Sequence, residues 1–182
     1  LSNFCSPVSA NNLTEDLGFS SVNTTKKYME YLREPYLFYY LPRYNHKLKL
    51  MKNAPKKVYV VDNGFIASKA FSLSDNLGRL LENQVFVELL RRGYDIDKTL
   101  FYYRSQNDKE VDFVLRRGTR IESLVQVCYD MSNAKTEKRV VDSIVECAEE
   151  LKCDNLIIVT SDDSRLIEKK NYKIKVVPFA EF

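Results

Sequence analysis

The 182-residue sequence has a single histidine, His46, and no tryptophan. A Ser-His-Asp or Cys-His triad needs a histidine at its centre, and His46 lies in a predicted loop among lysines, so we expect no triad within this chain. The pattern GxxxxGK[ST] is also missing. This part of the protein therefore cannot hold ATP in the manner of a P-loop.

Cysteine pairs and long apolar runs are missing as well. The four cysteines contain no CxxC pair, and their spacing fits neither a zinc site nor a disulfide framework. We expect reduced thiols and a cytoplasmic protein. No run of about 18 apolar residues occurs, so no membrane span is predicted, and no basic-then-apolar leader is visible. Because the sequence begins with Leu1, we expect a piece excised from a longer protein.

Positive charge is concentrated in the first part of the chain. The formal net charge is +3, but residues 1–70 hold ten Lys or Arg against five Asp or Glu, and residues 71–182 hold eighteen against twenty. An excess of this kind indicates contact with nucleic acid, although a solvated surface gives the same count.

The stretch KEVDFVLRRGTRIESLVQV, residues 109–127, predicts a hairpin that turns at Gly118. Two polar side chains interrupt its apolar strands, Asp112 in the first and Gln126 in the second. With a turn at Gly118 they face each other, and cross-strand partners about 5 Å apart are close enough to share a metal ion. A carboxylate at a strand end, solvated by water, is the alternative.

A helix is predicted upstream, over residues 75–93, from leucine and valine at helical spacing and a glycine C-cap. Glu82 interrupts its apolar surface. If this helix packs on the hairpin, Glu82 brings a third oxygen to Asp112 and Gln126. Glu110, two residues before Asp112, lies on the same strand face and is a further candidate ligand.

The order of helix acid, strand Asp and strand Gln resembles the PD-(D/E)XK nuclease fold. More closely, GRLLEN, KEVDFV and LVQVCYD resemble the C-terminal domain of unknown function of predicted AAA-type P-loop ATPases from bacteria and archaea. The resemblance implies a restriction-endonuclease-like sheet over residues 71–182 and an N-terminal AAA-type ATPase domain in cis as partner. ATP would bind only to that missing part. It also implies Glu82, Asp112 and Gln126 as a degenerate catalytic and metal site, with Mg²⁺ or Mn²⁺ as the possible ion.

Two positions depart from an active nuclease. The lysine expected two residues after the second acid is Cys128, and Gln126 replaces the usual glutamate. A neutral thiol cannot supply positive charge, and Mg²⁺ prefers carboxylates. We therefore expect a fold retained without its chemistry. Lys135 or Lys138, on the following predicted helix, is the alternative source of the charge.

Residues 1–70 are predicted to form a winged helix-turn-helix. Ser9 and Ser21 can cap two helices, with Val22, Tyr28 or Met29, and Leu32 facing inward in the second, and Pro35 marks its end. Two apolar strands follow, with a charged wing tip between them. Five basic residues are the candidate nucleic-acid contacts: Lys26, Lys27, Arg43, Lys47 and Lys49.

The rest of the chain predicts a helix from about residue 134, a central strand over 154–162 and a last strand over 173–177. The fold class is therefore mixed α/β: a winged helix, then a mixed sheet with flanking helices. Three functions stay open. They are a non-catalytic module recognising DNA or a protein partner, a metal-dependent nuclease with a displaced lysine, and an oligomerisation or docking domain.

Overall fold

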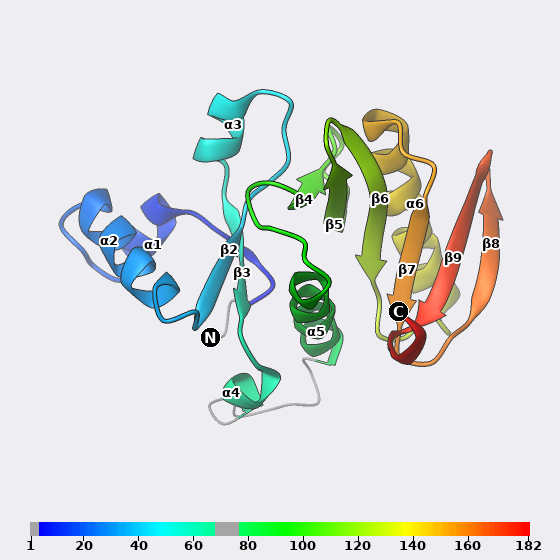
Figure 1. Cartoon of the computed structure of the whole chain (residues 1–182), viewed down its shortest axis with the longest axis horizontal. Helices are drawn as coiled ribbons and strands as arrows, with labels where there is room; N and C mark the ends of the chain where they lie inside the picture. The colour runs from blue at the N-terminus through cyan, green and yellow to red at the C-terminus, as the bar shows by residue number, and fades with distance from the viewer. Residues whose placement is uncertain (1–3, 68–76) are drawn as a thin grey trace.

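A computed structural model describes residues 4–67 and 77–182. These residues form a mixed α/β fold, as the sequence predicts, with a three-stranded and a six-stranded sheet. Figure 1 shows the two sheets at opposite sides of helix α5 (Leu77–Arg91). The predicted domain boundary near residue 70 lies outside the described residues.

The smaller sheet is antiparallel, in the order β1-β3-β2. Its strands are β1 (Pro7–Val8), β2 (Phe38–Leu41) and β3 (Lys56–Val60). Two helices, α1 (Ala10–Asp16) and α2 (Val22–Arg33), lie between β1 and β2. Ser9 and Ser21 cap them, because their hydroxyls accept from the backbone N–H groups of Asn12 and Thr24. Both caps, and the end of α2 just before Pro35, match the prediction.

The face that α2 buries differs in part from the predicted one. Thr25 is buried and its hydroxyl bonds that of Thr14 on α1 at 2.6 Å. Tyr28 and Leu32 are 52% and 43% exposed, whereas Val22 and Met29, the predicted alternative to Tyr28, are half-buried. A small polar pair therefore joins the two helices, because threonine lets them approach closely and satisfies both hydroxyls.

The predicted wing tip contains a helix, α3 (Leu48–Asn53). Met51 of this helix is buried in one core with Tyr44 and Phe101. That apolar anchor explains why the segment folds back as a helix although its lysines are exposed. A further short helix, α4 (Asn63–Ala67), follows β3.

The larger sheet has the order β4-β5-β6-β7-β9-β8. Its strands are β4 (Leu100–Arg104), β5 (Glu110–Arg117), β6 (Arg120–Val127), β7 (Leu156–Thr160), β8 (Arg165–Lys169) and β9 (Tyr172–Pro178). The pairs β6–β7 and β7–β9 are parallel and the others antiparallel. Helix α6 (Ala134–Leu151) connects β6 to β7, and a 3₁₀ turn, η2 (Phe179–Glu181), ends the chain.

Most of these elements match the predicted ones. The hairpin turns at Gly118, whose φ of +60° suits glycine, and α5 is followed by Gly93 at φ +87°. The helix α6 begins at the predicted residue 134. Strand β8 was not predicted, since three of its five residues are charged and it lies at the sheet edge.

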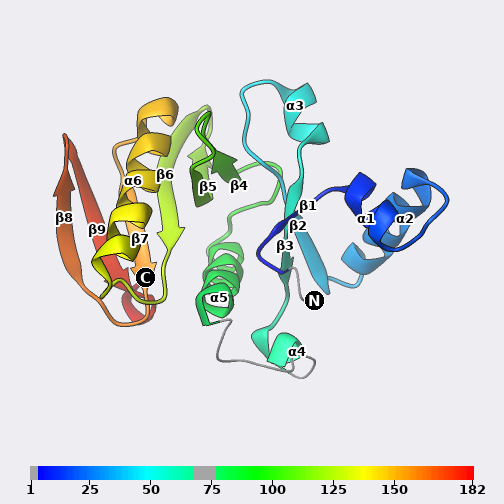
Figure 2. The same cartoon turned by 180° about the vertical axis from the view of Figure 1, so that it is seen from behind.

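Two apolar cores fill the two faces of the larger sheet. The helix α6 covers one face, and α5 together with the smaller sheet covers the other (Figure 2). Tyr59 of β3 stacks on Phe86 of α5 with ring centroids 4.1 Å apart. The first part of the chain is thus packed directly onto the second. Among the described helices, none is both long and apolar enough to span a bilayer.

Candidate functional site

The site lies where β3, α5 and β5 meet, and a lysine is at its centre. The ammonium of Lys57 is 2.9 Å from Glu82 Oε1, 2.8 Å from Glu110 Oε1 and 2.8 Å from Asp112 Oδ1. The Lys57 side chain is only 2% exposed. A buried ammonium is costly unless it is paired and hydrogen-bonded, and here each of its three protons has a carboxylate oxygen within reach.

Asp112 is held on both oxygens. Oδ1 accepts from Lys57, and Oδ2 accepts from the amide of Gln126 at 2.6 Å and from the backbone N–H of Val127 at 2.9 Å. The predicted pairing of Asp112 with Gln126 therefore exists, as a direct hydrogen bond across the β5–β6 hairpin. The neighbouring pair Phe113–Val125 sets this register.

Glu82 reaches the site from α5. Its Oε1 accepts from Lys57 at 2.9 Å and from the Tyr59 hydroxyl at 2.7 Å. Burial and the nearby charge of Asp112 raise the pKa of Glu82 to about 7, although Lys57 and Tyr59 act in the opposite direction. Glu82 therefore carries only part of a negative charge near neutral pH.

The pKa of Lys57 is well above its ordinary value. Burial lowers it, but the charges of Asp112, Glu82 and Glu110 outweigh burial. Lys57 is thus a fixed cation rather than a general base. The strand supplies it because alternate residues of β3 share a face, so Lys57 and Tyr59 both point toward α5 and β5.

The carboxylates do not fit a metal ion. The ammonium occupies the space between Glu82, Glu110 and Asp112, and the second oxygen of Asp112 is already hydrogen-bonded. Gln126 turns its amide donor, not its oxygen, toward Asp112, and its buried Oε1 has no hydrogen-bond partner among the described residues. Within residues 4–67 and 77–182, no group of three or more His, Cys, Asp or Glu is arranged to hold a metal.

The lysines predicted as alternative sources of positive charge do not lie at this carboxylate cluster. Lys135 and Lys138 are exposed on α6, which covers the opposite face of the sheet. Cys128 is half-buried, burial raises the pKa of its thiol, and its Sγ contacts the backbone oxygen of Asp130 at 3.3 Å. Lys57 supplies positive charge beside these acids, and no pattern in the sequence singles it out.

Four of the five candidate nucleic-acid residues are exposed: Lys26 and Lys27 on α2, and Lys47 and Lys49 at α3. Arg43 differs, because its Nη2 donates to the backbone oxygen of Arg104 at 2.6 Å and its buried Nε has no partner in the part of the chain that the structure describes. Arg43 therefore joins the first part of the chain to β4.

Comparison with known proteins gives two family matches. The domain of unknown function DUF4143 matches residues 77–182, and the domain of unknown function DUF8612 matches residues 2–76. Uncharacterized protein MJ1544 of Methanocaldococcus jannaschii is 35% identical over 158 residues, which are 84% of this chain and 34% of that protein. An uncharacterized protein of Haemophilus influenzae is 34% identical over 122 residues, 67% of this chain and 29% of that protein. The chain thus spans about a third of the length of these relatives. No solved structure matches it significantly.

Proposed function

The chain belongs to the family of the domain of unknown function DUF4143, and from this premise we propose that it is a non-catalytic module that recognises nucleic acid through its basic first part. Residues 1–70 would be a winged-helix domain, and residues 71–182 a domain of nuclease-like fold without nuclease chemistry. This module would serve an AAA-type ATPase domain located in the same polypeptide. The length of the relatives leaves room for such a domain.

One observation carries the non-catalytic part of the proposal. The Lys57 ammonium lies within 2.9 Å of Glu82, Glu110 and Asp112 at a place that is almost closed to water. A nuclease site must expose its carboxylates to a metal and to the phosphate that is cut. Here the same carboxylates are used to bind the first part of the chain to the second, so the cluster acts as a structural clamp.

Three features support the winged-helix assignment. Two capped helices precede a strand pair, β1 adds a third strand beside β3, and the exposed face of α2 carries Lys26 and Lys27. In helix-turn-helix proteins the second helix enters the major groove, and lysines beside it contact phosphates. Lys47 and Lys49 at α3 would add contacts from the region of the wing.

Cleavage assays test the first half of this proposal. We expect no cleavage of single- or double-stranded DNA or RNA in single-turnover reactions with Mg²⁺ or Mn²⁺. Cleavage by the wild-type protein that is abolished by Asp112→Ala would overturn it. A displaced-lysine nuclease is the second candidate, because Lys57 does contact the acids. It requires that Lys57→Ala also abolishes cleavage.

Binding assays test the second half. Fluorescence anisotropy with a 20-base-pair duplex should give an affinity that falls steeply between about 50 and 200 mM salt. Charge reversal by Lys47→Glu with Lys49→Glu should weaken binding, whereas the matched pair Lys135→Glu with Lys138→Glu, exposed on α6, should not. Absence of salt-dependent binding would favour a docking domain without a nucleic-acid role.

A further inference from the structure

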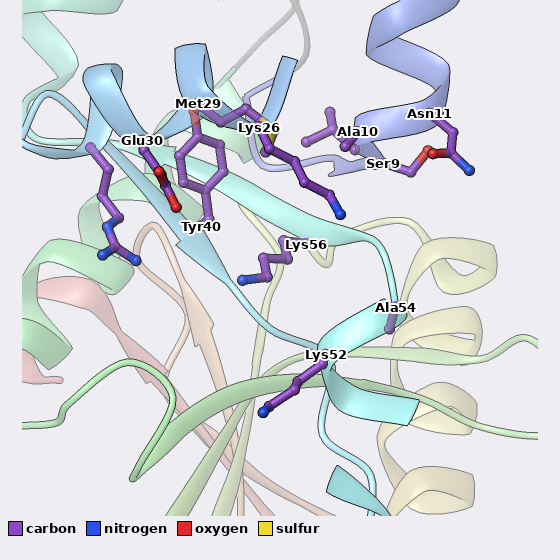
Figure 3. A pocket seen from close by; sticks show the side chains of 12 residues that line it. Ser9, Ala10, Asn11, Lys26, Met29, Glu30, Tyr40, Lys52, Ala54 and Lys56 are labelled. Atoms are coloured by element: carbon purple, nitrogen blue, oxygen red, sulfur yellow. The ribbon is translucent and has the colours of Figure 1, made fainter. Parts of the chain in front are cut away.

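A hollow lies on the opposite face of β3 from the carboxylate clamp. It has a volume of about 480 Å³ and is enclosed by the start of α1, by α2, by β2 and by the segment from α3 to β3. Figure 3 shows Lys26 of α2, Lys52 of α3 and Lys56 of β3 around this hollow, with their side chains pointing in different directions. Pockets of this size accept small organic ligands or single nucleotide units.

The hollow is strongly basic. Four cationic side chains line it, Lys26, Arg33, Lys52 and Lys56, against one carboxylate, Glu30. None of the four cations has an ion pair with a carboxylate in the part of the chain that the structure describes. Cations gathered without counter-charges repel one another, so an anion that binds among them lowers the free energy of the folded protein.

Lys56 lines this hollow from strand β3, the strand that also carries Lys57. It is half-buried and precedes Lys57 on β3, and successive strand residues point to opposite faces. Lys57 is neutralised by three carboxylates, whereas Lys56 points into the hollow, where Glu30 is the single acid. The other three cations, Lys26, Arg33 and Lys52, are exposed to solvent, so Lys56 is the least exposed of the four.

The rest of the wall mixes polar residues, Ser9 and Asn11 among them, with apolar and aromatic ones. Met29 and Tyr40 are half-buried and lie beside the cations. An aromatic ring next to several ammonium groups suits a ligand that has both a phosphate and a planar base or sugar, because the ring can pack on the uncharged part.

We propose that this pocket binds a phosphate group, with Lys26, Arg33, Lys52 and Lys56 as its contacts. The inference deepens the proposed function, on which it rests, by naming the place where a nucleic-acid phosphate is held. The same chemistry accepts the phosphate of a free nucleotide. Competition between pyrophosphate and a DNA duplex distinguishes a nucleic-acid phosphate from the phosphate of a free nucleotide.

The test uses pyrophosphate as the probe in isothermal titration calorimetry at about 50 mM salt. We expect pyrophosphate to bind at one site of the wild-type protein. In the double variant Lys52→Gln with Lys56→Gln, the affinity should fall about tenfold or more for each lysine removed, because each charge-assisted contact is worth a factor of that order. The control pair Lys47→Gln with Lys49→Gln lies outside the pocket lining and should stay within about twofold of the wild-type affinity. Thermal unfolding checks that both pairs fold. If the pocket pair unfolds, Arg33→Gln, at an exposed position, replaces it.

Duplex DNA in the anisotropy assay distinguishes the sources. If the pocket holds a DNA phosphate, pyrophosphate competes with the duplex and the pocket pair weakens duplex binding. If pyrophosphate binds but the duplex does not, the pocket serves a free phosphorylated ligand. The nucleic-acid proposal is then overturned, and the phosphate-pocket proposal stands. If the duplex binds while pyrophosphate does not bind the wild-type protein, or binds all variants equally, the pocket proposal is overturned and the nucleic-acid proposal stands.

Discussion

Lys56 and Lys57 are neighbours on one strand, yet they belong to opposite kinds of site. Lys57 is 2% exposed and contacts three carboxylates, whereas Lys56 is half-buried and lines a hollow in which cations outnumber acids. The strand alternation sends them to different faces of the smaller sheet. The comparison shows that surroundings, not residue type or position in the sequence, decide whether a lysine stabilises the fold or remains available to a ligand.

The largest expected effect comes from removing the buried cation. Lys57→Met leaves Glu82 and Asp112 buried beside each other without a counter-charge. Breaking a buried ion pair by removing one partner costs about 3–5 kcal/mol, so we expect a loss of that size in the free energy of unfolding at pH 8, measured by urea titration. The loss should shrink toward pH 5, because protonation removes the repulsion between the two carboxylates.

A loss below about 1 kcal/mol at pH 8 would contradict the assignment of Lys57 as a clamp. In that case the first part of the chain would be held by its apolar contacts alone, such as the stack of Tyr59 on Phe86. Asp112→Asn serves as the partner variant, since it keeps the shape of the side chain but removes one of the anions around Lys57.

The next effect concerns pH and Glu82. Its pKa is raised from 4.5 to about 7 in the folded protein by burial and by Asp112. The folded state thus holds this proton more tightly than the unfolded state, so the stability it contributes is complete below pH 4.5 and is lost as the pH rises to about 7. Glu82→Gln removes that dependence, and its unfolding free energy should rise relative to wild type by about 2–3 kcal/mol between pH 4.5 and 7.5. Parallel pH profiles for the two proteins would contradict the raised pKa.

A smaller effect on stability is expected from replacing Gln126. Its amide donates to Asp112 at 2.6 Å, so Gln126→Glu replaces a donor with a like charge. We expect a cost of about 2 kcal/mol at pH 8, less at pH 5 where the new carboxyl is protonated and can donate again. The control Gln126→Met loses only the hydrogen bond and should show little pH dependence. Stabilisation of Gln126→Glu by Mg²⁺ in a thermal shift assay would contradict the conclusion that Lys57 fills the space a metal would need.

The sequence predicts the local elements around the clamp well. The hairpin with its turn at Gly118, the facing of Asp112 and Gln126, and the helix start at residue 134 all follow from short-range patterns of strand alternation, helical period and turn residues. The nuclease-like and AAA-type assignments have a different origin, because they come from family resemblance, whereas the winged-helix assignment comes from the caps and strand pattern of residues 1–70. They remain predictions.

The role of Lys57 could not be predicted in the same way. It lies 55 residues from Asp112 in sequence, and its contact depends on how two separately predicted parts pack together. The signal was present, since a lysine sharing a strand face with the buried Tyr59 is unusual, but it was hidden in a run of lysines typical of a solvated loop. Helix α3 was missed for a similar reason, because the anchoring of Met51 is a tertiary contact.

The smallest expected effect comes from replacing Lys56, the second lysine of the comparison. Lys56→Met removes a cation that repels its neighbours in the pocket and has no carboxylate contact within the described ranges. We expect the unfolding free energy to change by less than about 0.5 kcal/mol, with a slight gain at low salt where the repulsion is least screened. The same urea titration as for Lys57→Met measures it, one residue away on the same strand. Since both variants replace lysine with methionine on β3, a similar large loss in both would mean that strand packing, rather than the three carboxylates, sets the cost at Lys57.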